Sequence, residues 1–287
     1  MKKGIAERQN ESNMLDCQYA ARYYYNIAER INKYVWVSSI MLVLFSVINF
    51  NSSWINIISV FVLDILISIL TYLVFYNIKK ATTLRAYFDS YVLDINIDKY
   101  TDKDLRNIKE NIFRVVSKKK SNYYKQINNT GLDKPPGVKD WYYISNINGV
   151  GLKYDCQKQN IYWDEKLLYK RLGCCALMIV LIVGAFLLGF KYISLTSIAL
   201  AILSSAGFII RCAERLISNI KYIIISIKIS GMVCIIDLNI SEKNIGILQD
   251  EINNKRNIPI MGSNFIHKLR NYKITLTYKA ISSNMEQ

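Results

Sequence analysis

The chain has 287 residues, 52% of them hydrophobic, and its 37 lysines and arginines exceed the 22 acidic residues to give a formal net charge of +15. A single histidine, His267, excludes metal sites built on histidine pairs, and the six cysteines have no zinc-like spacing. We therefore expect no disulfide, no metal and no cofactor.

The segment 1–33 is predicted to be a cytoplasmic amphipathic helix, because apolar residues between Ile5 and Ile31 recur near helical spacing. Neither proline nor glycine occurs in it after Gly4. We expect this helix to continue without a break into the apolar stretch that begins at Tyr34.

Four apolar stretches dominate the chain, and each is close to the roughly 20 residues that a helix needs to cross the hydrocarbon core. They cover residues 34–50, 54–76, 172–190 and 192–210. The first two form a transmembrane hairpin over 34–76, and the last two form a second hairpin over 172–210. The fold class we expect is an all-α membrane protein with four transmembrane helices in two hairpins and a mainly helical cytoplasmic bundle.

The two hairpin turns hold almost no charge, whereas the other three polar segments hold nearly all of the lysines and arginines. The positive-inside rule therefore places residues 1–33, 77–171 and 211–287 in the cytoplasm. The lysine excess has two interpretations. It can serve a basic ligand site, or it can reflect an AT-rich genome together with the positive-inside bias.

The cytoplasmic segment 77–171 is predicted to combine helices with a loop region. The second apolar helix meets no breaker before Asn96, and Thr101 with Asp104 three residues later predicts a capped helix start. Residues 128–151 are rich in asparagine, proline and glycine, which indicates a structured loop.

In the segment 211–287, residues 220–238 are apolar enough to resemble a fifth span, but they contain Lys221 and Lys228. A lysine at the membrane centre costs about 2.5 to 3.5 kcal/mol on insertion scales, so we predict a buried cytoplasmic helix instead. Ser241 is expected to begin a further helix that ends before Pro259.

Three segments give the chain a resemblance to the SMODS-associated four-transmembrane effectors, which are encoded beside bacterial cyclic-oligonucleotide synthases. They are Ile5-Ala-Glu-Arg-Gln-Asn-Glu near the start, the stretch from Cys156 to Asp164, and Leu248-Gln-Asp-Glu-Ile with Arg256. The chain departs from that family's expected proline, aspartate, tryptophan and aromatic run near the carboxyl end, where it has Ile258-Pro-Ile-Met-Gly.

The resemblance implies a role in cyclic-oligonucleotide-based antiphage signalling. In such a system, infection activates a synthase, and its cyclic oligonucleotide triggers a multi-pass effector of the bacterial inner membrane, with both termini cytoplasmic. The expected partners are that messenger, the lipid bilayer and further copies of the chain, and no DNA or RNA polymer is expected.

No catalytic constellation is visible, since the chain contains neither a GxxxxGK[ST] loop nor a GxSxG elbow, and we predict that it is not an enzyme. A receptor for a cyclic oligonucleotide needs cationic donors and stacking aromatics. The densest such cluster is predicted as a ligand site and consists of Arg114, Lys118, Lys119, Lys120, Tyr123, Tyr124 and Lys125. Its alternative interpretation is a solvated helix end.

A second candidate ligand site is the run Gln157, Lys158, Gln159 and Asn160, directly before the third apolar stretch. In the alternative interpretation these side chains satisfy helix ends and pack the bundle, and Trp163 and Asp164 mark a helix start.

The acidic residue Asp64 lies within the second apolar stretch and should face other helices, a partner subunit or water. With Ser68 it suggests a polar seam for a pore, or else a protonated carboxyl within a closed bundle. Small residues of the fourth stretch, including Ser204 and Gly207, favour close helix packing or oligomer contact.

The function predicted from these observations is a membrane-disrupting effector that a cyclic oligonucleotide activates to oligomerise or repack, which causes abortive infection. Two alternatives remain. One is a membrane scaffold that recruits a cytoplasmic partner, and the other is a constitutive small channel or transporter.

Overall fold

The computed structural model describes residues 3–48, 54–118, 122–144, 149–189 and 195–259. Within these residues the secondary structure is helical, apart from one isolated bridge between Thr130 and Lys139. The helices in chain order are α1 (Ile5–Gln9), α2 (Ser12–Ile48), α3 (Trp54–Leu93), η1 (Ile97–Lys99), α4 (Asp102–Val116), α5 (Tyr123–Asn128), α6 (Val150–Gly189), α7 (Leu195–Leu238) and α8 (Glu242–Arg256). The prediction of an all-α fold is confirmed for this part of the chain.

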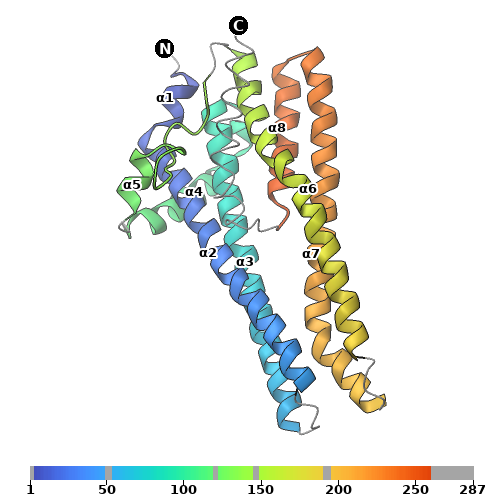
Figure 1. The fold of residues 1–287 in the computed structure, drawn as a ribbon. Helices are drawn as coiled ribbons and strands as arrows, with labels where there is room; N and C mark the ends of the chain where they lie inside the picture. The colour runs from blue at the N-terminus through green and yellow to red at the C-terminus, as the bar shows by residue number, and fades with distance from the viewer. Residues whose placement is uncertain (1–2, 49–53, 119–121, 145–148, 190–194, 260–287) are drawn as a thin grey trace.

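Four long helices form two antiparallel hairpins, α2 with α3 and α6 with α7 (Figure 1). The short helices α1, α4, α5 and α8 pack around one end of both hairpins. At the other end the two hairpins extend beyond this bundle (Figure 1), and α7 contacts α2 and α3 there. The molecule therefore has a helical bundle at one end and paired apolar helices at the other.

The long helices are continuous across the boundaries between polar and apolar sequence. α2 confirms that a helix continues into the first apolar stretch, and α3 continues to Leu93, close to the expected breaker Asn96. The prediction of one unbroken helix from Ile5 is wrong, because α1 ends at Gln9 and α2 begins at Ser12. Asp94, directly after Leu93, adopts a left-handed conformation with φ of 55°, which ends helical propagation, and Asn96 is left-handed as well.

The two predicted helix starts in the cytoplasmic segments are confirmed by their caps. The Thr101 side chain and the Asp104 side chain bond to each other's backbone N–H groups as a capping box. At the start of α8 the Ser241 hydroxyl accepts a hydrogen bond from Asn244 N.

The predicted helix start at Trp163 and Asp164 is wrong, because α6 runs without interruption from Val150 to Gly189. The helix begins after Gly149, whose φ of 69° suits glycine. The run from Gln157 to Asn160 is therefore helical.

α7 differs from the prediction in a similar way. Residues 220–238 do not form a separate helix, because they continue the helix that carries the fourth apolar stretch. Only one face of this part is buried, through Tyr222, Ile229 and Ile236, while Ile224 and Ile227 on the other face are about 60% exposed. The expectation of a buried helix thus holds for one face alone.

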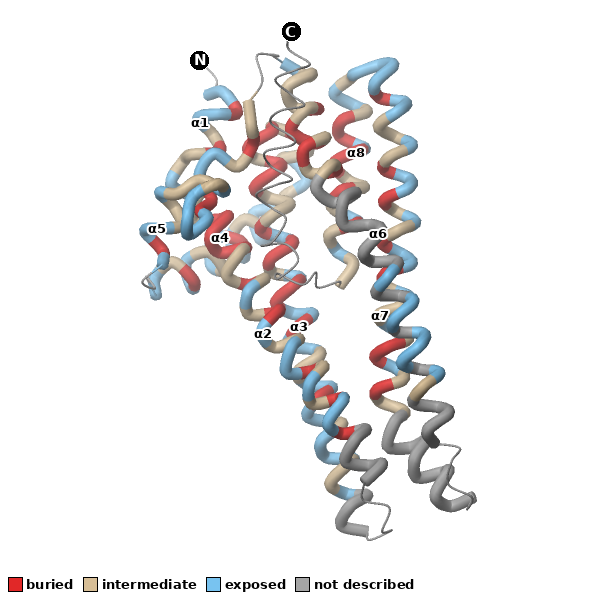
Figure 2. The backbone as a smooth tube through the Cα atoms, viewed as in Figure 1, coloured by how far each residue is buried: buried red, intermediate tan, exposed pale blue. Residues whose placement is uncertain are grey.

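The largest apolar core lies inside the bundle, and every described α-helix from α1 to α8 contributes buried residues to it. Its fully buried members include Met14, Phe88, Tyr142, Tyr154 and Leu248. Figure 2 shows these buried segments concentrated in the bundle, whereas the described parts of the extended hairpins are largely exposed.

Two described segments are long and apolar enough to cross a membrane, Ile58–Leu93 in α3 and Ala206–Leu238 in α7. Only 11% and 28% of their most apolar windows are buried within the protein. The core helix of a water-soluble domain would be covered by other helices, so the exposure of α3 favours contact with lipid. The α7 segment lies mostly within residues 211–238, which the charge pattern places in the cytoplasm, so its exposure does not support a span. Much of the first, third and fourth predicted spans lies outside the residues whose side chains the structure describes.

Candidate functional site

A buried carboxylate, Asp89 of α3, lies at the centre of the bundle. It is fully buried and accepts a hydrogen bond of 2.6 Å from Arg256 Nη1 at the end of α8. Its other oxygen accepts a hydrogen bond of 2.6 Å from the hydroxyl of Tyr142. The charge of Asp89 is therefore both paired and hydrogen-bonded, as a buried carboxylate requires.

Amide side chains surround this carboxylate. Gln249 Nε2 lies 3.5 Å from Asp89, and Gln157 Nε2 donates to Gln249 Oε1 at 3.0 Å. Asn160 Nδ2 donates to the Tyr142 hydroxyl at 3.0 Å. We refer to Asp89, Tyr142, Gln157, Asn160, Gln249 and Arg256 as the Asp89 cluster.

The loop that carries Tyr142 is held from both sides by glutamine side chains. Gln9 of α1 accepts from Tyr142 N at 2.8 Å and donates to Tyr142 O at 3.3 Å. Gln159 of α6 accepts from Tyr143 N at 3.0 Å and donates to Tyr143 O at 2.6 Å. Each amide therefore pairs with the backbone as a neighbouring strand would.

Protonation states follow from this packing. Burial raises the pKa of Tyr142 well above its ordinary value, and the neighbouring Asp89 charge raises it further, so the phenol stays a proton donor. Burial disfavours the Arg256 charge, but Asp89 outweighs this effect and raises the pKa of Arg256. At neutral pH the cluster therefore holds a charged guanidinium and a neutral phenol.

The three segments that carry the family resemblance meet around this cluster. Gln9 comes from the first segment, Gln157 from the second, and Gln249 from the third with Arg256 after it. Asp89 itself was missed by the sequence reasoning. The feature that could have identified it is an acidic residue directly after Phe88, on the face of the helix that packs into the bundle.

The predicted run Gln157 to Asn160 is thus engaged in packing. Gln157 is fully buried and also donates to Ile245 O at 3.1 Å. Lys158 lies 3.3 Å from Asp155 and 4.8 Å from the centre of the Tyr154 ring. These contacts match the packing interpretation of the run, and its ligand-binding role stays a prediction.

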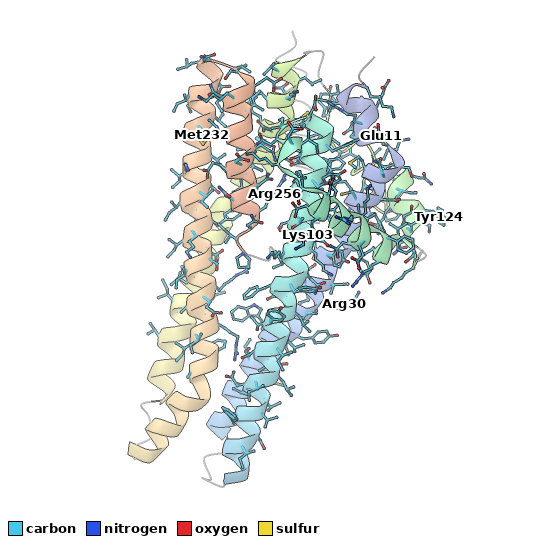
Figure 3. All side chains as sticks on the ribbon, turned by 180° about the vertical axis from the view of Figure 1, so that it is seen from behind. Glu11, Arg30, Lys103, Tyr124, Met232 and Arg256 are labelled. Atoms are coloured by element: carbon cyan, nitrogen blue, oxygen red, sulfur yellow. The ribbon has the colours of Figure 1, made fainter. Side chains whose placement is uncertain are left out.

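The predicted basic cluster lies elsewhere, on α4 and α5, which pack against α2. Arg114 pairs with Glu110 at 2.6 Å on the surface, and Tyr123 donates to Asp16 at 2.5 Å. Tyr124 lies at the outer edge of the bundle (Figure 3) and Lys118 is exposed, whereas residues 119–121 lie outside the described part of the chain. The structure does not place the described members in one site with the run on α6.

The second polar feature is an ion pair between the hairpins. Arg211 of α7 donates from Nη2 to Asp64 Oδ1 of α3 at 2.8 Å, and its side chain is only 9% exposed. Asp64 therefore faces another helix, which is one of the environments that the sequence predicted. The partner Arg211 was missed, because its position at the end of the fourth apolar stretch does not indicate what it contacts.

Close packing at this ion pair depends on Gly207, since a Cβ at that position would overlap the Asp64 carboxylate. One turn further along α3, the Ser68 hydroxyl donates to Asp64 O at 2.8 Å within its own helix. Ser204 lies among the residues whose side chains the structure does not describe.

A cavity of about 50 Å³ adjoins Arg211 between the hairpins. It has room for one or two water molecules, and its walls include Trp36 of α2, Phe75 of α3, and Glu214 of α7. Pro259, three residues after Arg256, also lines it. The end of α8 therefore contacts both the Asp89 cluster and the cavity beside the ion pair.

Within the residues that the structure describes, no group of three or more histidine, cysteine, aspartate or glutamate side chains could hold a metal ion. The arrangement suits binding and conformational change, with a charged cluster in a bundle and an ion pair between apolar hairpins. These features define a helical membrane protein with a substantial polar bundle.

Residues 3–229 match the family described as the SMODS-associating 4TM effector domain. Because this match covers most of the chain, the protein belongs to that family, as the resemblance predicted. No curated protein and no solved structure matches the chain.

Proposed function

We propose that this protein is a membrane effector of antiphage defence, which a cyclic oligonucleotide activates to disrupt the inner membrane and cause abortive infection. Its family is associated with cyclic-oligonucleotide-based antiphage systems. The exposed apolar length of α3 supports a membrane location.

In this proposal the four long helices cross the membrane, and both termini lie in the cytoplasm. The bundle made by residues 1–33, 77–171 and 211–287 then faces the compartment in which a synthase releases its product. The charge distribution and the positive-inside rule support this orientation.

The observation that carries the proposal is that two arginine–aspartate pairs join α3 to the α7–α8 unit. Asp64 pairs with Arg211, and Asp89 pairs with Arg256. The two carboxylates lie about 38 Å apart along one continuous helix at 1.5 Å per residue. A ligand that binds the bundle can therefore bias the contact between the apolar hairpins, by as much as its affinities for the two arrangements differ.

Self-association belongs to the same proposal, because four helices are too few for a wide pore. On the cytoplasmic part of α7, Ile217, Ile220, Ile224 and Ile227 recur at intervals of three and four residues. All four are exposed, and the spacing is that of a coiled-coil seam. This face is suited to pairing with the same face of a second copy.

The test is dye leakage from liposomes that contain verified amounts of the full chain, with a panel of cyclic di- and trinucleotides. Leakage with one nucleotide and none without it is expected. If no member of the panel causes leakage, the nucleotide-gated function is refuted, and the alternative function of a membrane scaffold remains. If leakage and toxicity occur equally without nucleotide or co-expressed synthase, the protein is a constitutive channel.

A further inference from the structure

A second group of arginines lies beside the Asp89 cluster, at the contact of α2 and α3. Arg22 of α2 donates to the carbonyl oxygens of Pro136 and Gly137, both at 2.8 Å. Arg85 of α3 donates to Gln18 Oε1, and its guanidinium lies 3.5 Å from the centre of the Trp141 ring. We refer to Gln18, Arg22, Arg85 and Trp141 as the arginine cluster.

The positive charge of this cluster is not balanced by protein carboxylates. Within the described residues, neither Arg22 nor Arg85 has a carboxylate at ion-pair distance. The nearby Asp89 already pairs with Arg256 and accepts from Tyr142. Arg85 and Arg256 therefore share one carboxylate, and Arg22 adds a third positive charge beside Arg85.

Each of these charges is disfavoured by its surroundings. Burial lowers the pKa of Arg22 to about 10, and the charge of Arg85 lowers it further. Burial also lowers the pKa of Arg85, as does the charge of Arg256. Both groups stay protonated at neutral pH, so a bound anion would relieve the repulsion between them.

An unsatisfied donor lies in the same place. Gln18 is 1% exposed, and its Nε2 has no hydrogen-bond partner, although its Oε1 accepts from Arg85. Buried polar atoms in folded proteins almost always have a partner. The missing group must be an acceptor, and an anion oxygen between Gln18 and the two arginines would supply it.

We propose that the arginine cluster binds the phosphodiester group of a nucleotide, with a base stacked on the platform that Arg85 and Trp141 form. Guanidinium groups match phosphate oxygens in geometry, and both guanidinium and indole planes stack on bases. This inference rests on the proposed function and assigns its messenger a site that differs from both predicted ligand sites.

The position of the cluster favours a soluble ligand over a lipid headgroup. Arg22 precedes the predicted start of the first span at Tyr34 by roughly three helical turns, which is about 18 Å. Lipid phosphates lie at the membrane surface, so they do not reach this depth in the bundle. The partial exposure of Arg22 and Arg85 leaves the site accessible from the cytoplasm.

The experiment measures the affinity of the full chain in nanodiscs for a panel of cyclic di- and trinucleotides and for inorganic pyrophosphate. Arg85→Gln and Arg22→Gln are each expected to weaken binding at least tenfold. Arg106→Gln removes an exposed arginine of α4 whose Nε donates only to its own helix, and it should stay within twofold of the wild type. Vesicles of phosphatidylglycerol should not compete.

Folding is checked by the melting temperature without ligand. Because Arg85 has no carboxylate partner, Arg85→Gln should melt at or above the wild-type temperature. An Arg85→Gln chain that is strongly destabilised would show that Arg85 has a structural role, and that result would overturn the inference.

The remaining outcomes separate the site from the function. If Arg85→Gln binds a nucleotide as tightly as the wild type while Arg114→Gln does not, the inference is overturned and the proposed function stands. If pyrophosphate binds through Arg85 but no nucleotide does, the anion site stands and the nucleotide-gated function fails. Binding of neither probe, or competition by phosphatidylglycerol vesicles, overturns the site as proposed.

Discussion

Replacing Asp64 by asparagine would leave the Arg211 charge without its partner in an apolar contact. Breaking a buried ion pair by removing one partner costs about 3 to 5 kcal/mol. The Asp64 side chain is 36% exposed, so we reduce the expected cost to about 2 to 3 kcal/mol. Because each 1.4 kcal/mol is a factor of ten, the resting arrangement would be disfavoured by roughly 30- to 140-fold.

The assay is dye leakage from liposomes without any nucleotide, in which Asp64→Asn should leak far more than the wild type. The double variant Asp64→Asn with Arg211→Gln should leak less than the single variant, because it leaves no unpaired charge. Ser68→Ala is the matched control, since its hydroxyl bonds only within its own helix. Wild-type leakage from Asp64→Asn would refute the idea that this pair holds the hairpins together.

Gly207→Ala should reproduce the leakage of the broken ion pair by displacing its carboxylate, whereas Gly231→Ala on the same helix, with open space around it, should not leak. Burial raises the pKa of Cys17 well above its ordinary range, so single-cysteine chains should react with maleimide at pH 8 through the exposed Cys234 within minutes and through Cys17 only after unfolding. Rapid reaction of Cys17 in the folded chain would contradict its buried position. Ile224→Glu should reduce chemical crosslinking between copies at least severalfold without lowering the melting temperature, and unchanged crosslinking would exclude this face as the contact.

Much of the fold could be predicted from sequence, because helix starts and apolar periodicity are local properties. Thr101 and Ser241 were identified as caps from a few neighbouring residues. The absence of breakers predicted the continuity of α2 into the first apolar stretch but missed the interruption between Gln9 and Ser12. The start of α6 was missed because Trp163 and Asp164 have the composition of a helix start, although the helix already continues through them.

The polar sites could be predicted only in part, because their geometry depends on contacts between segments far apart in sequence. Asp64 was recognised from its cost in an apolar stretch, but its partner Arg211 comes from another hairpin. The importance of Asp89 depends on Tyr142 and Arg256, neither of which lies near it in sequence. Residue type alone therefore drew attention to surface lysines rather than to these buried groups.

The two aspartates of α3 attach this helix to α7 and to α8 at widely separated points. When thermal motion briefly breaks the ion pair at Asp64, the pair at Asp89 still holds α3 in place. When the pair at Asp89 breaks, the pair at Asp64 holds it. Spontaneous separation of α3 from α7 and α8 then requires both ion pairs to break at the same time. Its probability is roughly the product of the two small probabilities of breaking each pair. Under the proposed function, this redundancy would suppress activation in uninfected cells and make the response to the nucleotide steep.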